Sequence, residues 1–314
     1  GLLGAGMMGA GIAYVSAKAG MEVVLLDTSQ EAAERGKAYS EGLLKKAIER
    51  GYSTPDKAAA LLGLIKPTTS YHDLQGCDLV IEAVFESVEI KADVTAKTAA
   101  VVPETCIFAS NTSTLPITGL ARASERPEQF IGLHFFSPVD KMPLVEIILG
   151  EKTNDEAIAR SLDYIQQIRK TPIVVNDSRG FYTSRVFSTF TAEGITMLAE
   201  GVKPALIENA AKMAGLPVGP LAVTDEVTLE LAYKIGKETA AALGREFPAD
   251  LSQEVIQKMV ETLDRKGKRF GKGFYEYPKD GKKHLWSGLS GQFPVREDQP
   301  DVDELKKRML NIQA

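Results

Sequence analysis

The sequence contains little that would build a disulfide framework, a metal centre or a membrane span. Its 314 residues include two cysteines, Cys77 and Cys106, which do not form a C-x-x-C pair. We therefore expect neither a disulfide framework nor a structural zinc site, and a reducing compartment is the simpler interpretation. Charged or turn residues interrupt every apolar run before it reaches about 18 residues, so no membrane-spanning helix is predicted.

The chain also lacks an excess of positive charge. Its 37 lysines and arginines are outnumbered by 42 aspartates and glutamates, which gives a net charge of −5. General electrostatic attraction to nucleic acid or to an anionic membrane is thus not expected, and a polyanionic ligand would need a local basic patch. A hydrophobic content of 44% and a charged content of 25% are typical of a globular chain and exclude a disordered one.

Strand-like and helical patterns alternate in the first part of the chain only. A βαβ unit is predicted for residues 2–26, residues 31–62 have a helical pattern, and strand-like runs recur after them. This alternation predicts an α/β fold for residues 1–176, a Rossmann-type, mostly parallel sheet with helices on both faces. Residues 177–277 show only helical periodicity and predict an all-helical C-terminal domain, and residues 278–314 are interpreted as a linker and the start of a following helical segment.

A glycine motif in the βαβ unit predicts a dinucleotide site. Gly4, Gly6 and Gly9 form G-x-G-x-x-G after a predicted strand and at the start of a predicted helix. Asp27 ends the next apolar run, 18 residues after Gly9, which is close to the spacing of about 20 residues expected for such a site. Its carboxylate would accept hydrogen bonds from ribose hydroxyls and repel a 2′-phosphate, so the cofactor is predicted to be NAD. The alternative is a glycine-rich turn without a ligand.

His134 and Glu146 interrupt two apolar strands and are candidates for acid–base chemistry. A histidine beside aromatic residues is more often a core residue than a catalyst, and a glutamate in a strand can occupy an exposed edge. A buried carboxylate, however, requires a cationic or hydrogen-bonding partner. If the two strand ends lie side by side, Glu146 could hold one imidazole nitrogen and make the other a general base. Hydroxyl residues from Ser110 to Thr114 follow another strand and could orient a substrate, although such clusters are more often caps or turns.

Together these motifs resemble the L-3-hydroxyacyl-CoA dehydrogenase family, and the resemblance covers nearly the whole chain up to Tyr277. After Tyr277 the chain is more similar to the dehydrogenase part of the multifunctional fatty-acid oxidation enzyme, its alpha subunit. The motifs that carry the resemblance are residues 4–13, 81–86, 110–113, 132–136, 143–146, 180–181 and 271–275.

The resemblance implies NAD-dependent oxidation of L-3-hydroxyacyl-CoA to 3-ketoacyl-CoA in fatty-acid β-oxidation. It implies that His134 is the general base, that Glu146 is its partner and that Ser113 hydrogen-bonds the substrate oxygen. It also implies a set of residues along the cofactor. These are Gly4, Gly6, Met7, Met8, Gly9, Asp27, Ala83, Glu86 and Lys91.

At two positions the chain has serine where the family has asparagine, namely Ser137 and Ser184. Serine donates a hydrogen bond but reaches less far, which puts direct substrate contact by these two residues in question. The phosphates of coenzyme A require a basic patch, and Lys45 and Arg50 are one candidate. The basic residues between 265 and 272 are another, and a solvated surface is the alternative for both.

Two other functions remain open from the sequence. One is an NAD-dependent dehydrogenase of a free β-hydroxy acid, and the other is a catalytically silent NAD-binding scaffold. The expected partners are an acyl-CoA substrate and either a second copy in a homodimer or hydratase and thiolase parts of a larger multifunctional assembly. The expected compartment is the bacterial cytoplasm, with the mitochondrial matrix as the alternative.

Overall fold

The structure is a computed structural model that describes residues 1–313, without the side chain of Ala242. The chain divides into two compact units, and the division falls between Ser184 and Arg185. The boundary expected from the sequence lay between residues 176 and 177. No helix in the described part of the chain is long and apolar enough to cross a membrane.

The first unit is built on one sheet that, within the described residues, has eight strands in the order β3-β2-β1-β4-β5-β6-β7-β8. Neighbouring strands are parallel except β6 and β7, which are antiparallel. The strands are β1 (Leu2–Leu3), β2 (Val23–Leu26), β3 (Ile65–Thr68), β4 (Leu79–Glu82), β5 (Ile107–Ser110), β6 (Phe130–Phe135), β7 (Leu144–Leu149) and β8 (Thr171–Asn176).

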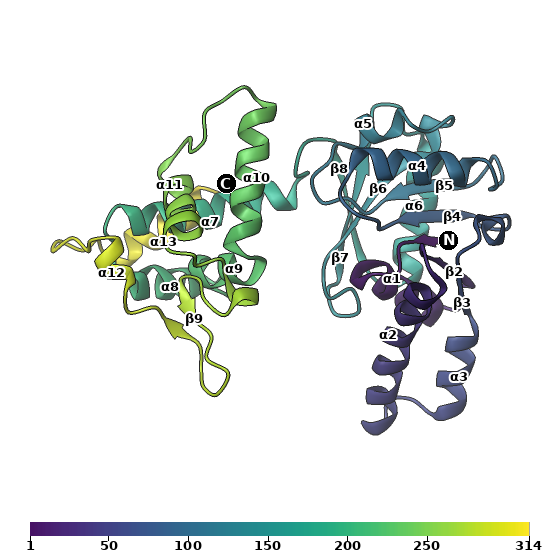
Figure 1. Ribbon diagram of the computed structural model, residues 1–314, viewed down its shortest axis with the longest axis horizontal. Coiled ribbons are helices and arrows are strands. Elements are labelled where there is room, and N and C mark those ends of the chain that lie inside the picture. The colour runs from purple at the N-terminus through teal and green to yellow at the C-terminus, as the bar shows by residue number, and fades with distance from the viewer. Residues whose placement is uncertain (314) are drawn as a thin grey trace. The chain divides into compact units, whose positions relative to one another are not determined.

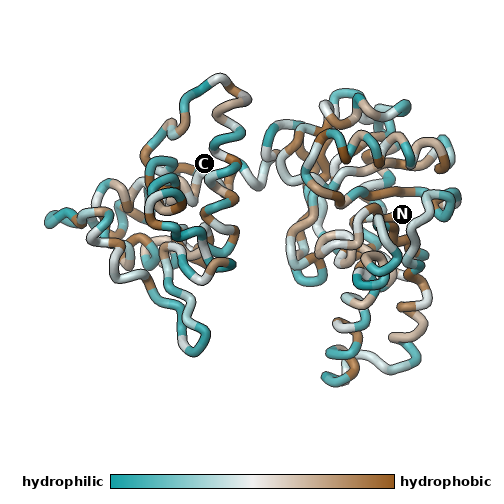
Figure 2. Tube along the Cα trace, in the orientation of Figure 1, coloured by the Kyte–Doolittle hydropathy of each residue, from teal (hydrophilic) through white to brown (hydrophobic). Residues whose placement is uncertain are grey.

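Helices cover both faces of this sheet (Figure 1). Successive residues of a strand point to opposite faces, and in β6 Phe130 belongs to one core whereas Ile131 and Leu133 belong to the other. The first-unit helices are α1 (Met7–Lys18), α2 (Gln30–Glu49), α3 (Pro55–Gly63), α4 (Val88–Ala99), α5 (Ile117–Ala121) and α6 (Asp155–Gln167). Figure 2 shows hydrophobic stretches along the strands and hydrophilic turns at their ends, as expected for a sheet buried on both faces.

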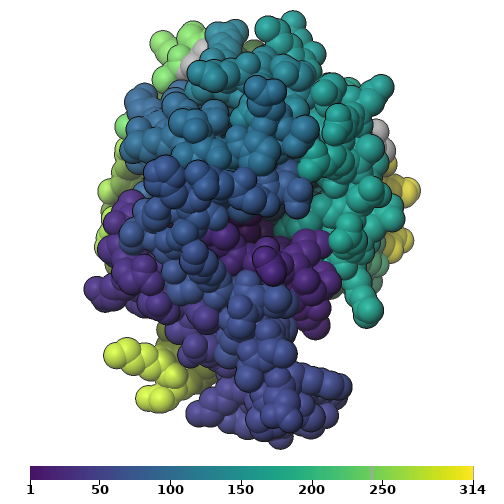
Figure 3. All heavy atoms as spheres, turned by 90° about the vertical axis from the view of Figure 1, so that its right-hand side faces the viewer, coloured from purple at the N-terminus to yellow at the C-terminus, as the bar shows by residue number. Residues whose placement is uncertain are grey.

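Strand β3 was not predicted, because Lys66 and Pro67 break its apolar pattern. The strand lies at the edge of the sheet, where proline is tolerated because one side needs no hydrogen bonds. It matters for the site, since the Asp27 N–H donates to the Thr68 carbonyl at 3.1 Å. Helices α2 and α3 precede it as a hairpin that projects from the rest of the first unit (Figures 1 and 3).

The second unit is mainly helical, but it is not entirely so. Strands β9 (Tyr275–Glu276) and β10 (His284–Leu285) form a short antiparallel pair, so the prediction of helices alone is wrong in this detail. The helices are α7 (Thr183–Ala199), whose first residues belong to the first unit, α8 (Pro204–Met213), α9 (Pro220–Val227), α10 (Leu229–Ala242), α11 (Leu251–Gln257), α12 (Leu289–Gln292) and α13 (Val302–Asn311). A π-helical turn, Lys258–Thr262, continues α11.

Residues 278–313 belong to this second unit, whereas the sequence suggested a linker and the start of another segment. Helix α13 contacts α8, and its Leu305 and Met309 are completely buried. They share one hydrophobic core with Leu198 and Ile207. The amphipathic pattern of α13 predicts a buried face but does not indicate which core will receive it.

Candidate active site

The glycine motif forms a tight turn that leaves room next to the first helix. Gly4 has a φ of +90°, and a Cβ at Gly9 would lie 1.8 Å from the Gly4 carbonyl oxygen. A Cβ at Gly6, by contrast, would meet nothing within 4 Å, so the backbone is open to a ligand there. Gly6 is also the N-cap of α1, whose first N–H groups can receive a phosphate. Ala83 lies against the turn, since its carbonyl oxygen would be 2.8 Å from a Cβ at Gly4.

Asp27 stands at a pocket of about 280 Å³ beside this turn. The Ala5 N–H donates to its Oδ2 at 2.7 Å, and the Thr28 N–H donates to its Oδ1 at 2.6 Å, which fixes the carboxylate at the end of β2. Gly6, Met7, Arg35 and Tyr39 also line the pocket. An open glycine turn, a helix N-terminus and an acidic residue at the pocket fit a dinucleotide whose ribose lacks a 2′-phosphate.

The structure brings Met7 and Ser137 together. The Met7 side chain is 65% exposed at the start of α1, and the Ser137 hydroxyl donates a hydrogen bond to its Sδ at 3.5 Å. Ser137 is exposed and follows β6, two residues after Phe135. Two residues predicted from different motifs therefore lie on one surface, whereas Met8 is only partly exposed and packs against the core.

His134 and Glu146 face each other on the antiparallel strands β6 and β7. His134 Nδ1 lies 2.7 Å from Glu146 Oε2, and the two side chains are buried. The imidazole also contacts the Phe136 and Phe181 rings, with centroid distances of 4.6 and 5.8 Å. Because β7 lies between β6 and β8, the alternative that Glu146 occupies an exposed edge is wrong.

The start of α7 supplies further donors to Glu146. Its Oε1 accepts hydrogen bonds from the N–H groups of Tyr182 at 3.0 Å and Thr183 at 2.8 Å, and Oε2 accepts one from Thr183 Oγ1 at 2.6 Å. Burial by itself would raise the pKa of Glu146, but the hydrogen bonds from His134 and Thr183 outweigh it and hold that pKa below its usual value. Thr183 was not predicted as a site residue. The available signal was a threonine at the start of a helix, two residues after the Gly180-Phe181 motif.

This arrangement is able to support proton transfer at one defined atom. A charged Glu146 accepts the proton of Nδ1, so neutral His134 carries its lone pair on Nε2. Within residues 1–313, Nε2 makes no hydrogen bond.

The Asn111 side chain stabilises β6, the strand that carries His134, because its Oδ1 accepts a hydrogen bond from the Phe135 N–H at 2.9 Å. Asn111 lies in the sequence motif at residues 110–113, but the sequence did not indicate a role for it.

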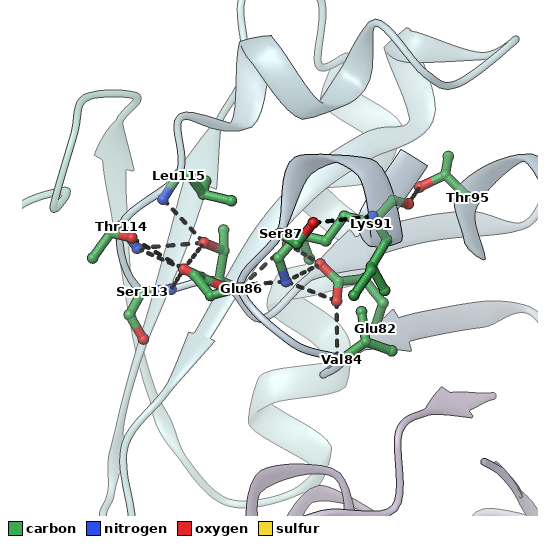
Figure 4. Close-up of polar contacts among 12 residues, drawn as sticks. Glu82, Val84, Glu86, Ser87, Lys91, Thr95, Ser113, Thr114 and Leu115 are labelled. Carbon is green, nitrogen blue, oxygen red and sulfur yellow. Dashed lines mark hydrogen bonds and ion pairs between the residues drawn. The ribbon is translucent and has the colours of Figure 1, made fainter. Parts of the chain in front are cut away.

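Glu86 and Lys91 belong to a charged network with a third residue, Glu82 (Figure 4). Lys91 Nζ lies 2.9 and 3.0 Å from the two carboxylate oxygens of Glu82 and 3.3 Å from Glu86 Oε2. Lys91 and Glu82 are buried, and burial raises the pKa of Glu82. Ser113 is exposed, and its N–H donates to Glu86 Oε1 at 3.1 Å. Glu82 was not predicted as a site residue.

The predicted coenzyme A contacts lie apart from this network. Lys45 and Arg50 are exposed at the far end of α2, a helix that begins near Asp27 and is about 30 Å long by its 20 residues. Ser184 follows Thr183 in the first turn of α7.

Four residues of the alternative basic stretch form ion pairs with acidic side chains. Arg265 lies 2.9 Å from Glu276, and Lys272 lies 2.9 Å from Asp264. Lys266 and Lys268 are also paired with acidic side chains. No cluster of histidine, cysteine or acidic residues able to hold a metal ion occurs among the described residues.

Comparison with known proteins identifies the family. Residues 1–178 match the 3-hydroxyacyl-CoA dehydrogenase, NAD binding domain, and residues 180–277 match the 3-hydroxyacyl-CoA dehydrogenase, C-terminal domain. The chain therefore belongs to the 3-hydroxyacyl-CoA dehydrogenase family, a class of NAD-dependent oxidoreductases, and its cofactor is NAD.

Among its relatives is the fatty acid oxidation complex subunit alpha of Shewanella loihica, which is 39% identical over 95% of this chain. The chain spans only 42% of that relative's length. A similar solved structure is the (S)-3-hydroxybutyryl-CoA dehydrogenase of Ralstonia eutropha, with a TM-score of 0.82, 35% identity and coverage of 88% of this chain and 98% of that one. The 3-hydroxybutyryl-CoA dehydrogenase of Escherichia coli gives a TM-score of 0.83 at 33% identity, over 89% of this chain and 59% of that one.

Proposed function

We propose that the chain catalyses the reversible, NAD-dependent oxidation of L-3-hydroxyacyl-CoA to 3-ketoacyl-CoA in fatty-acid β-oxidation. The single observation that supports this most strongly is the buried pair of His134 Nδ1 and Glu146 Oε2 at 2.7 Å, on the same unit as the glycine turn. An imidazole held at one nitrogen by an ionised carboxylate is arranged as a general base, and a scaffold without catalytic activity would not require that arrangement.

In the proposed reaction His134 Nε2 takes the proton of the 3-hydroxyl group. NAD, when bound, supplies the acceptor for the hydride that leaves C3. The charge that develops on the imidazole is stabilised by Glu146, which remains ionised because four hydrogen bonds reach its oxygens. In the reverse direction the same nitrogen returns the proton, so one residue serves as base and acid.

Several residues are proposed to bind rather than to transfer protons. The glycine turn with Met7, Met8 and Ala83, and Asp27 at the pocket, would hold the dinucleotide. Ser113 would donate a hydrogen bond to the substrate oxygen, and its exposed hydroxyl has no hydrogen bond within residues 1–313. Ser137 and Ser184 are proposed as further substrate contacts, and Lys45 and Arg50 as contacts for the phosphates of coenzyme A.

Absorbance of NADH tests the reaction directly. The purified chain should oxidise NADH with acetoacetyl-CoA and should do so far more slowly with acetoacetate at the same concentration. Equal rates with the two compounds would favour the free-acid dehydrogenase. Binding of NADH without turnover of either would favour the scaffold.

We further propose that the chain works as the dehydrogenase part of a larger fatty-acid oxidation enzyme with hydratase and thiolase partners, in the bacterial cytoplasm. The bacterial fatty acid oxidation complex subunits support this proposal, and so does a structure described as the dehydrogenase part of a multifunctional enzyme of Caenorhabditis elegans, which is 25% identical with a TM-score of 0.69. A homodimer of the chain alone is the other arrangement. Light scattering of the purified chain would distinguish a dimer from a monomer.

A further inference from the structure

The segment that carries Ser113 is irregular, and it owes much of its order to one side chain. It connects β5 (Ile107–Ser110) with α5 (Ile117–Ala121) and contains neither helix nor strand. An irregular segment needs hydrogen-bond partners for its N–H groups from elsewhere in the fold. Here the Glu86 carboxylate, which lies before β5 in the sequence, supplies the acceptor for the N–H groups of Ser113 and Thr114.

Oxygen Oε1 of Glu86 accepts four hydrogen bonds from three consecutive residues of this segment. The donors are Thr112 Oγ1 at 2.5 Å, the N–H groups of Ser113 at 3.1 Å and Thr114 at 3.2 Å, and Thr114 Oγ1 at 3.1 Å. Thr112 Oγ1 in turn accepts from the Leu115 N–H at 3.0 Å. These contacts fix the backbone on both sides of Ser113, and in Figure 4 the Ser113 hydroxyl points away from Glu86.

The other oxygen of Glu86 is held by the buried network. Oε2 lies 3.3 Å from Lys91 Nζ, and Lys91 is fixed by both oxygens of Glu82. Burial would raise the pKa of Glu86, but Lys91 and Thr112 outweigh it and hold that pKa below its usual value. The carboxylate is therefore charged at neutral pH and anchored on one side while it holds the segment on the other.

We propose that Glu86 is a positioning residue that sets the direction of the Ser113 hydroxyl toward the substrate oxygen. This role rests on the proposed function, because it matters only if Ser113 binds the substrate. It also differs from direct contact of Glu86 with the cofactor, which the family resemblance implies. An oxygen that already accepts four hydrogen bonds has little capacity left for a ligand, since a carboxylate oxygen offers about two lone-pair sites.

The test combines Glu86→Gln, Ser113→Ala and the double variant. Glutamine keeps the shape but places an NH₂ group against either Lys91 or the donors of the segment. We expect Glu86→Gln to lower kcat/KM for acetoacetyl-CoA roughly 10- to 100-fold. In the Ser113→Ala background, Glu86→Gln should lower kcat/KM less than about twofold, because the effects of residues that act through one another are non-additive.

The Kd of NADH should change less than about twofold in Glu86→Gln. Glu89→Gln, an exposed carboxylate on the first turn of α4, is the matched control and should leave all values unchanged.

Hydrogen exchange provides a readout that does not depend on turnover. The amides of Ser113 and Thr114 should exchange at least about tenfold faster in Glu86→Gln than in Glu89→Gln, since they lose a charged acceptor. If Glu86→Gln does not fold, Thr114→Val removes only the hydrogen bond from Thr114 Oγ1 to Glu86 at nearly constant shape and should give a smaller change in the same direction.

Additive losses in the double variant, unchanged exchange at Ser113 and Thr114, or weaker NADH binding with retained kcat would each overturn the positioning role. Failure of the proposed function is distinguishable, because the wild-type chain itself would then not turn over acetoacetyl-CoA. In that case faster exchange would still show that Glu86 orders the segment, but the role in substrate positioning would be withdrawn.

Discussion

Replacing Glu146 with glutamine should stop most catalysis through a change of tautomer. Two of its hydrogen bonds come from the backbone N–H groups of Tyr182 and Thr183, which can only donate. The glutamine must keep its oxygen toward them, so its NH₂ group takes the position of Oε2 and faces His134 Nδ1. The imidazole then carries its proton on Nε2, the nitrogen that should accept the proton of the substrate.

The size of the effect follows from the same geometry. Blocking a general base costs about 10²–10⁴-fold in kcat, and the variant also loses a negative charge next to the imidazolium ion. Two unit charges about 4 Å apart at an effective dielectric constant of about 20 attract each other by about 4 kcal/mol, and the loss of this attraction acts on the acid limb of the rate profile. That limb of the oxidation rate should move to lower pH, because protonation of the pair becomes less favourable.

The assay is kcat for 3-hydroxyacyl-CoA oxidation from pH 5 to 9, with NADH binding and thermal unfolding as controls. The chain has three histidines, so ¹⁵N spectra can assign the protonated nitrogen of His134 in both proteins. Glu151→Gln changes an exposed carboxylate and serves as the matched control. A Glu146→Gln protein with kcat within about threefold of wild type and an unmoved acid limb would refute the role of the pair.

Three further predictions follow from the same contacts. Wild-type kcat/KM should be at least about 100-fold higher with NADH than with NADPH, because the Asp27 carboxylate repels a 2′-phosphate. Equal kcat/KM values for the two cofactors would show that Asp27 does not contact the ribose. The double variant Lys45→Ala, Arg50→Ala should raise KM for acetoacetyl-CoA several-fold at low salt and leave KM for NADH unchanged. Lys57→Ala on α3 is the control. An unchanged KM for acetoacetyl-CoA in the double variant would exclude α2 as the phosphate contact. Hydrogen bonds from His134 and Thr183 hold the pKa of folded Glu146 below its usual value, so its stabilisation is present above the usual pKa and is lost as the pH falls through the lower, folded value. The stability difference between wild type and Glu146→Gln, measured by urea unfolding, should therefore shrink as the solution becomes more acidic than the usual pKa of a glutamate. A constant difference would contradict the pKa direction.

Much of the first unit is predictable because its local and periodic signals agree. The glycine turn, the following helix and Asp27 are defined by short sequence spacing, and the sheet is defined by long apolar runs. The contact between His134 and Glu146 is predictable because two polar residues interrupt apolar strands that are neighbours in sequence. The hairpin between them pairs the strands directly, so short separation translates into contact.

The features that were not predicted depend on contacts between segments far apart in the chain, which the spacing of residues in the sequence does not indicate. Strand β3 is short and contains Pro67, and only its place at the sheet edge makes it a strand. Glu82 reads as the polar end of an apolar strand, yet its role comes from Lys91 on a different element. Thr183 reaches Glu146 from 37 residues away, and α13 packs on a helix about 100 residues earlier in the chain.

Turnover of His134→Gln tests the central claim most directly. The glutamine lacks a nitrogen that can take up a proton, whereas the glycine turn and Asp27 are untouched. The account predicts that kcat falls about 10²–10⁴-fold in both directions while the Kd of NADH stays within about twofold of wild type. His72→Gln, a change at an exposed histidine, should leave kcat unaltered. Near-normal turnover of the His134→Gln protein would contradict the account, because the proton would then have to leave the substrate by another route.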